Sequence, residues 1–227
     1  MTKHFDTQSQ ENRQIEIFGP SFSNFVRSIM LLCEEKNIEY TTGLNFAGET
    51  IDFKSEQHFN LHPFVKFPII KHQTLILSET ASICRYIQST FVDNASALFS
   101  PQQSARIDAF SAIISIYIDK ALVRDYLLEF AFPKGDKGEV RFDVVKEMQK
   151  PALEALMSIE NELTHSDTLN NEHLSIADVL IAPILHYVSV LPSPFNLVVD
   201  FPNIQDYLLR LMRRESFKKV LVAPRNW

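Results

Sequence analysis

The sequence predicts a two-part protein in which an α/β domain precedes an all-helical domain. Over residues 15–91, β-rich and helical runs alternate in the order βαβαββα. From 102–227 the apolar residues recur at helical spacing, and we find no convincing strand. The stretch "VDNASALFSP" (92–101) separates the two parts and is predicted to be a linker.

The first elements are a strand, a helix and a second strand. "IEIF" (15–18) is a short β-rich run that Gly19-Pro20 ends. After Phe22, apolar residues recur three and four positions apart, which predicts a helix. "IEYTTGLNF" (38–46) alternates enough to be the second strand. A right-handed crossover between the two strands makes them parallel.

The rest of the α/β half contains a short helix, two strands and a final helix. The short helix lies around "DFKSEQHFN", and the polar turn "KHQ" joins the strands "FPII" and "TLIL". So tight a turn makes those strands antiparallel. "SETASICRYIQSTF" (78–91) is the final helix. We therefore expect a mixed four-stranded sheet with helices on its faces.

The helical half begins with a long helix and continues with four more. "GDKG" (135–138) ends the long helix, and Ser175 with Asp178 forms a capping box at the start of "LSIADVLIAPILHYVSVL". Other helices are predicted in "VVKEMQKPALEALMSIENEL" and around "IQDYLLRLM" and "RESFKKVL". The apolar positions that define the long helix are Ile107, Phe110, Ile114, Ile118 and Leu122.

Composition excludes several classes of function. The 227 residues carry a formal charge of -6 and no basic cluster, so nucleic acid and anionic membranes are not expected partners. Cys33 and Cys84 lie in apolar helical patterns and are expected to be buried thiols, and we expect no metal site. Residues 1–14 are polar and are interpreted as a mobile tail. With no signal core or membrane span, the cytoplasm is the expected location.

Four segments, in order, carry a resemblance to one known protein family. They are "FGPSFSNFVRSIMLLCEEKNI", "HPFVKFPII", "LSETASICRYI" and "SIADVLIAP". They resemble segments of cytosolic glutathione S-transferases of the serine type, such as bacterial, phi or theta members. In that family the first is similar to the first strand, catalytic turn and first helix, the second to the Asn-Pro-(two or three residues)-Val-Pro segment, the third to the Glu-Ser-x-Ala-Ile-x-x-Tyr-Ile helix and the fourth to the capping box. The resemblance runs from Ile15 to about Val222.

The resemblance implies a thioredoxin-like first domain and an enzyme that joins glutathione to a small hydrophobic electrophile. Glutathione is then a co-substrate, and no other cofactor is expected. The resemblance also implies a detoxification role and a homodimer whose interface involves the third and fourth helices. His62, Phe67 and Thr80 stand where the family usually has Asn, Val and Ser.

Ser23 is the residue that the resemblance assigns to thiol activation. Only the thiolate of glutathione is nucleophilic, and a helix N-terminus with a hydroxyl donor can stabilise that anion. Arg27 follows four positions later, as in serine-type members, and receives a supporting role. Ser21 is the competing hydroxyl. The structural alternatives are a helix cap for Ser23 and a surface or interdomain ion pair for Arg27.

The remaining glutathione contacts are assigned by the same resemblance. Pro68 is expected to follow a cis bond, so that Phe67 offers its backbone to the cysteinyl unit. Glu79 is expected to bind the amine, and Thr80 the γ-glutamyl carboxylate at a helix N-terminus. Lysines are candidates for the glycine carboxylate: Lys54 and Lys66. A trans proline and a simple cap at Thr80 are the structural alternatives.

The second substrate is expected between the first domain and the long helix. Its identity does not follow from the sequence. Aromatic and apolar side chains are candidates for the walls of that pocket, although such residues are more often part of the core: Phe22, Phe110, Ile114, Tyr117 and Trp227.

Three other functions were weighed. A thiol oxidoreductase needs a cysteine at the helix start, where this chain has Ser23, and Cys33 lies almost three turns further on. A maleylacetoacetate isomerase resembles Ser-Ser-Cys in the catalytic turn, and "PSFSN" has no cysteine. A non-catalytic scaffold or regulator with the same fold remains an alternative that the sequence leaves open.

Overall fold

The computed structural model describes residues 13–92, 99–169 and 173–223. The chain divides into two units, Met1–Ser96 and Ala97–Trp227. Most of the predicted tail and the middle of the predicted linker lie outside the described residues. The first strand begins at Gln14 and the first helix of the second unit at Pro101.

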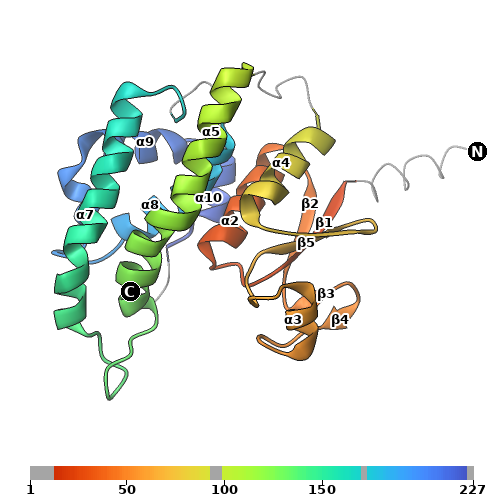
Figure 1. Ribbon diagram of the computed structural model, residues 1–227, viewed down its shortest axis with the longest axis horizontal. Helices are drawn as coiled ribbons and strands as arrows, with labels where there is room; N and C mark the ends of the chain where they lie inside the picture. Colours follow the sequence, from red (N-terminus) through yellow and green to blue (C-terminus); the bar gives the residue numbers. More distant parts are fainter. Residues whose placement is uncertain (1–12, 93–98, 170–172, 224–227) are drawn as a thin grey trace, which may run out of the picture. The chain divides into compact units, whose positions relative to one another are not determined.

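The N-terminal unit contains the mixed four-stranded sheet that the sequence predicted (Figure 1). The strand order is β2-β1-β5-β6, with β2 parallel to β1 and the other neighbours antiparallel. The elements are β1 (Gln14–Phe18), α2 (Asn24–Glu35), β2 (Glu39–Gly43), β3 (Asn45–Phe46), β4 (Glu49–Thr50), α3 (Glu56–Leu61), β5 (Ile69–His72), β6 (Leu75–Ser78) and α4 (Thr80–Thr90).

The small β3–β4 hairpin was not predicted. The stretch 38–46 was interpreted as one strand, but β2 ends at Gly43, where φ is +133°, a conformation that favours glycine. The chain then forms β3 and β4, each two residues long. Strands this short carry no readable alternation of apolar and polar residues, so sequence pattern could not detect them.

Two apolar clusters hold this unit together. Helices α2 and α4 contact each other through their buried faces, which contain Cys33 and Cys84. Burial raises the pKa of both thiols, that of Cys84 to about 12, so the prediction of buried thiols is confirmed. The second cluster joins the sheet, the hairpin and α3, and it comprises Phe18, Phe46, Ile51 and Ile69 with Leu61 and Phe67 packed against them.

Every described residue of the second unit lies outside β-strands, as predicted for an all-helical domain. The five predicted helices are all present, and the short 3₁₀-helix η2 is an addition. The elements are α5 (Pro101–Ile113), η1 (Ile114–Leu127), α6 (Leu128–Ala131), α7 (Phe142–His165), α8 (Ile176–Ser189), η2 (Leu197–Asp200), α9 (Pro202–Leu211) and α10 (Glu215–Val220).

The long helix is not a uniform α-helix. After α5 it continues as η1, a π-helix of 14 residues. In a π-helix the backbone hydrogen bonds join residues five positions apart, and two side-chain ion pairs of η1 join residues at the same spacing. Arg124 Nε donates to Asp119 Oδ2 at 2.5 Å, and Lys120 binds Asp125. The widened turn is uncommon and is often associated with functional sites.

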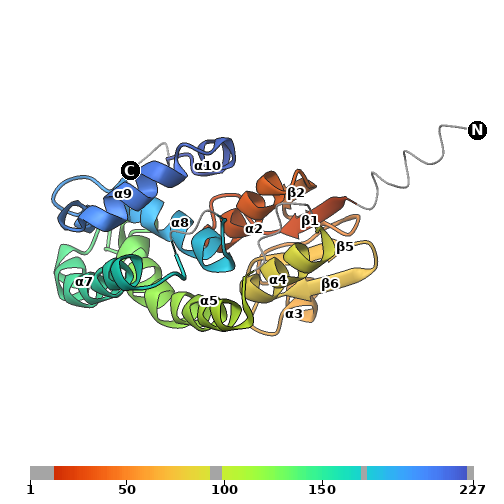
Figure 2. The ribbon, with the colours of Figure 1, turned by 90° about the horizontal axis from the view of Figure 1, so that it is seen from above.

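Helix α8 is the centre of the helical unit (Figures 1 and 2). All residues from Ile176 to Val188 are buried, and α8 contacts α5, η1 and α9. The predicted capping box is confirmed, since Asp178 N–H donates to Ser175 Oγ at 3.2 Å and Ser175 N–H donates to Asp178 Oδ2 at 2.7 Å. Tyr207 O–H donates to the other carboxylate oxygen of Asp178 at 2.7 Å.

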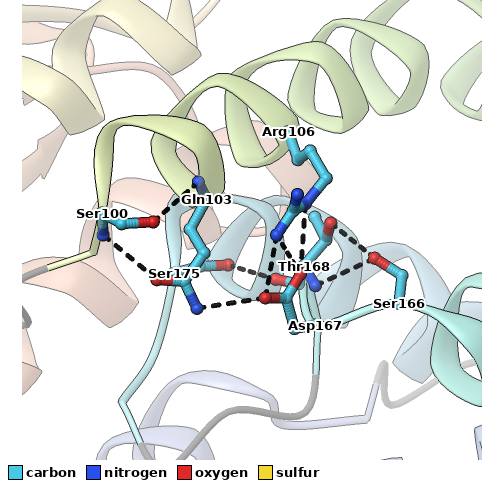
Figure 3. A network of polar contacts seen from close by, with 7 residues as sticks. All are labelled: Ser100, Gln103, Arg106, Ser166, Asp167, Thr168 and Ser175. Carbon is cyan, nitrogen blue, oxygen red and sulfur yellow. Dashed lines mark hydrogen bonds and ion pairs between the residues drawn. The ribbon is translucent and has the colours of Figure 1, made fainter.

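A polar network ties the start of α5 to the segment before α8 (Figure 3). Arg106 forms a forked pair with Asp167, with its shortest contact at 2.9 Å, and Gln103 Nε2 donates to the same carboxylate. Ser175 Oγ donates to the Thr168 carbonyl at 3.2 Å. The network therefore links the caps of two helices.

Among the residues described, no helix is long and apolar enough to cross a membrane.

Candidate active site

Three segments singled out in the sequence meet at one end of the sheet. Phe18, the last residue of β1, lies opposite Ile69, the first residue of β5. Ile69 in turn lies opposite Ser78, the last residue of β6. The turn after β1, the Phe67-Pro68 bond and the Glu79-Thr80 pair therefore leave the sheet at the same end.

Gly19 permits a close approach between the turn and the proline segment. Its φ is +141°, which favours glycine. A Cβ at this position would lie 2.7 Å from Val26 Cγ2 and 3.0 Å from Phe67 Cβ. Because neither distance leaves room for a methyl group, Gly19 allows the turn before α2 to pack directly against Phe67.

Ser23 is the N-cap residue of α2, as its sequence position predicted, but its side chain makes no capping hydrogen bond. Its backbone N–H donates to the Pro20 carbonyl at 2.9 Å. The Ser23 hydroxyl therefore lies at the positive end of the helix dipole but does not bond to the backbone N–H groups of the helix. Ser21, the competing hydroxyl, lies in the exposed part of the turn. The structure thus leaves the Ser23 hydroxyl available for a ligand.

Arg27 supports the turn. Its side chain is buried, which excludes the surface ion pair but not the interdomain ion pair that the sequence left as alternatives. Arg27 Nε donates to the Ser21 carbonyl at 3.2 Å. The bond ties α2 back to the segment before its N-terminus, so Arg27 acts on the shape of the turn.

The Phe67-Pro68 bond is cis, as predicted. The Phe67 ring is turned into an aromatic group in the N-terminal unit. It is stacked with His58 at a centroid distance of 4.9 Å and with Phe53 at 5.4 Å, and it meets Phe18 edge-on at 5.1 Å. Because the Phe67 ring packs against these aromatic residues, the part of Phe67 left to contact a ligand is its backbone.

His58 connects both lysine candidates to this aromatic group. Its Nδ1 accepts the Lys54 N–H at 3.3 Å, so the proton resides on Nε2, which donates to the Lys66 carbonyl at 3.2 Å. Burial lowers the pKa of His58, which favours this neutral form. Both lysine side chains are exposed, and Lys54 Nζ lies 5.1 Å from the Phe53 ring centroid.

Sequence reasoning gave His58 no role. A signal was present, because His58 lies in the predicted helical stretch "DFKSEQHFN" and His62 follows just beyond its end. The structure buries both side chains and uses both of them to hold backbone of the site.

Glu79 and Thr80 form the start of α4. Glu79 is the N-cap and has φ +70°, a conformation that costs about 1–3 kcal/mol for a residue other than glycine. Its side chain makes no capping bond, is 74% exposed, and contacts His62 Nε2 through Oε1 at 3.2 Å. Thr80 is the buried first residue of the helix. A helix N-terminus of this kind suits a carboxylate ligand.

Two of the residues predicted as walls for the second substrate are buried. Ile114 has no accessible surface and Phe110 is buried, so both belong to the core of the helical unit. Helical spacing marks an apolar face, but it does not say whether that face is covered. Phe22 and Tyr117 are exposed by 57% and 67%, and the neighbouring Ile116 is also exposed. Trp227 lies outside the described residues.

Within the described ranges, no group of three or more His, Cys, Asp or Glu side chains is placed to hold a metal ion. The groups gathered at the end of the sheet are a hydroxyl, a carboxylate and a helix N-terminus, and the exposed Lys54 and Lys66 lie on the two loops that flank α3. This set can bind a zwitterionic ligand and donate a hydrogen bond to an anion.

Comparison with known proteins agrees with this arrangement. The family model for the glutathione S-transferase N-terminal domain matches residues 22–90, and that for the C-terminal domain matches 112–215. The probable glutathione S-transferase GSTF1 of Oryza sativa subsp. japonica is 25% identical over 219 residues, covering 93% of this chain and 98% of the relative. A glutathione S-transferase of Hyoscyamus muticus is 25% identical over 212 residues, covering 91% and 97%.

Solved structures share the fold. Glutathione S-transferase-I bound with lactoylglutathione superposes with a TM-score of 0.75 at 22% identity, covering 91% of this chain and 98% of that chain. Glutathione S-transferase I from mais, in complex with an atrazine glutathione conjugate, gives 0.74 at 23% identity, covering 91% and 96%. Since both family models match in the order of the two units, the chain belongs to the glutathione S-transferase family.

Proposed function

We propose that this chain is a glutathione transferase that activates the thiol of glutathione for attack on a hydrophobic electrophile. The observation that carries the proposal is the Ser23 hydroxyl, which stands at the N-terminus of α2 and makes no capping bond. Family membership and the names of the relatives support the same activity.

In the proposed reaction, Ser23 O–H donates a hydrogen bond to the glutathione sulfur. The thiol proton leaves to solvent, and the dipole of α2 further stabilises the thiolate. The thiolate forms a C–S bond with the electrophilic carbon, and the displaced electron pair goes to the departing halide, to the epoxide oxygen or, in an addition, to the oxygen of the unsaturated carbonyl. Lowering the thiol pKa by one unit requires about 1.4 kcal/mol, which a charge-assisted hydrogen bond can supply.

The rest of glutathione is proposed to bind along the end of the sheet. The Phe67 backbone contacts the cysteinyl unit, and Glu79 binds the amine. The γ-glutamyl carboxylate binds at Thr80 and the N–H groups of α4, and Lys54 and Lys66 attract the glycine carboxylate. Each assignment pairs a charged group of the ligand with an opposite charge or a helix N-terminus. No cofactor enters this scheme, because glutathione itself supplies the nucleophile.

Two solved relatives are named with conjugates of glutathione, one with lactoylglutathione and one with an atrazine conjugate. For this chain, the exposed Phe22 and Tyr117 favour an apolar second substrate. We also propose a role in detoxification, a cytoplasmic location and a homodimer, all of which follow from family membership.

The test is a calorimetric titration with glutathione followed by conjugation assays on a small panel of aryl halides, epoxides and unsaturated carbonyls. We expect glutathione to bind, and at least one class of electrophile to react faster than in protein-free buffer. Binding without conjugation of any class would favour the non-catalytic alternative. Absence of binding would contradict the proposed function altogether.

A further inference from the structure

We propose that His62 is a positioning residue that holds the Glu79 carboxylate in place for the amine of glutathione. The inference rests on the proposed function and adds to it a residue outside the set assigned to ligand contact. His62 and Glu79 are 17 residues apart and come from different elements, the C-terminal end of α3 and the N-terminal end of α4.

The protonation of the His62 ring follows from its contacts. His62 is buried, and its Nδ1 lies 3.1 Å from the Phe64 N–H. A backbone N–H can only donate, so Nδ1 accepts and carries no proton. The neutral ring then has its proton on Nε2. That nitrogen faces Glu79 Oε1 at 3.2 Å and donates to it.

Glu79 gains orientation from this contact. Its side chain is mostly exposed and caps nothing, so a carboxylate there would otherwise sample several rotamers. The His62 ring is fixed by burial and by its bond to Phe64. It therefore offers a rigid donor that selects one position of Oε1.

A neutral donor also preserves the charge that the ligand needs. A lysine or arginine in this position would cancel the negative charge of Glu79. The neutral imidazole occupies Oε1 and leaves Oε2 to accept from a primary ammonium group, with the full carboxylate charge still available. The chemical class that this arrangement recognises is an ammonium next to the γ-glutamyl carboxylate.

Two substitutions separate the two functions of the ring. His62→Asn places an acceptor near the position of Nδ1 and keeps the Phe64 bond, but it does not reach Glu79. His62→Gln places a donor near the position of Nε2 and keeps the Glu79 contact. The first variant therefore tests positioning with the loop bond preserved, and the second should rescue it.

The experiment measures calorimetric affinity for glutathione and for a glutathione analogue that lacks the amine. Loss of one hydrogen bond predicts that His62→Asn binds glutathione about fivefold more weakly. Its affinity for the des-amino analogue should equal that of the wild type, because Glu79 has no partner there. His62→Gln should bind glutathione nearly as well as the wild type.

Several results would overturn the inference. One is an equal loss for both ligands in His62→Asn, which indicates a purely structural role; others are no loss at all, or an equal glutathione loss in His62→Gln. If His62→Asn does not fold, His62→Ala is compared in the wild type and in Glu79→Ala, and it must weaken glutathione binding only where Glu79 is present. Failure of the wild type to bind glutathione would instead contradict the proposed function, and this inference with it.

Discussion

At the scale of single residues, the choice between Ser21 and Ser23 as the thiol-activating residue depends on where each serine lies relative to the start of α2. Ser23 occupies the N-cap position but leaves the cap unmade, whereas Ser21 contributes its carbonyl to the Arg27 side chain. Because the Ser23 side chain makes no capping hydrogen bond, its hydroxyl can donate to a ligand.

Replacing Ser23 tests this interpretation. Ser23→Ala should lower kcat/KM for conjugation near neutral pH by roughly tenfold to a hundredfold, the value of a hydrogen bond to a charged group. Raising the pH should partly restore the rate, since the thiolate then forms unaided. The free energy of unfolding should change by less than about 1 kcal/mol, because the substitution removes no capping hydrogen bond. The measurements are pH–rate profiles and urea unfolding.

Ser21→Ala is the matched control, because it removes a hydroxyl from the same turn. We expect its pH–rate profile to follow that of the wild type. If Ser21→Ala shows the loss and Ser23→Ala does not, the assignment of the hydroxyl is wrong. If neither variant changes the profile, the thiolate is stabilised by backbone N–H groups alone.

We expect His58 to make the N-terminal unit sensitive to acid. Its pKa is lowered from 6.5 by burial, and the neighbouring His62 acts in the same direction, while the Lys66 carbonyl opposes them. The unfolded chain therefore binds the proton more readily than the folded one. The stability that the neutral His58 ring contributes is therefore complete above pH 6.5, and it is lost as the pH falls through the pKa of His58 in the folded protein. The measurement is the free energy of unfolding from urea titrations across this range.

His58→Asn is the control for that prediction. Asn can accept the Lys54 N–H in place of Nδ1, but it does not titrate. The wild type should therefore lose more stability than the variant between neutral pH and pH values below 6.5. Parallel curves for the two proteins would show that other groups cause the acid sensitivity.

At the scale of elements, α8 depends on its N-terminal cap. The Asp178 carboxylate is buried and receives both the Ser175 N–H and the Tyr207 hydroxyl. Burial, and secondly the contact with Asp178, raise the pKa of Tyr207 well above its ordinary value, so Tyr207 remains a neutral donor. A single side chain thus joins the start of α8 to α9.

Removing that carboxylate should be costly. Asp178→Ala leaves two buried donors without their acceptor, so we expect a loss of about 3 kcal/mol in the free energy of unfolding. Tyr207→Phe removes a single hydrogen bond and should lose about 1–2 kcal/mol. Chemical denaturation measures both. A larger loss for Tyr207→Phe than for Asp178→Ala would contradict this account of the cap.

The π-helix η1 shows how far periodicity can be used. Ile114, Ile118 and Leu122 predicted a helix correctly, and all three are buried. A four-residue spacing departs from one full turn by about 40° on an α-helix and is compatible with an α-helix and a π-helix alike. The helix type could therefore not be read from the spacing, and the segment was predicted as α.

At the scale of the whole molecule, the remaining prediction concerns assembly. The third and fourth helices of the chain, α4 and α5, are expected to form most of a twofold interface. Sedimentation at micromolar concentration should give twice the chain mass of 26.1 kDa. A stable species of single mass would contradict the proposed homodimer, while leaving the proposed chemistry in place.

The sequence by itself determined the order of the main elements, without the β3–β4 hairpin and η2, as well as the mixed sheet, the capping box of α8 and the segments that form the site. These features depend on local spacing, on turn residues and on motif resemblance, which all reside in short stretches of chain. Only the tertiary structure decided that His62 meets Glu79, that His58 holds the Lys54 and Lys66 backbones, and that Ile114 is core. Such contacts depend on how separate elements pack, because neither periodicity nor spacing specifies which side chains face each other across that packing.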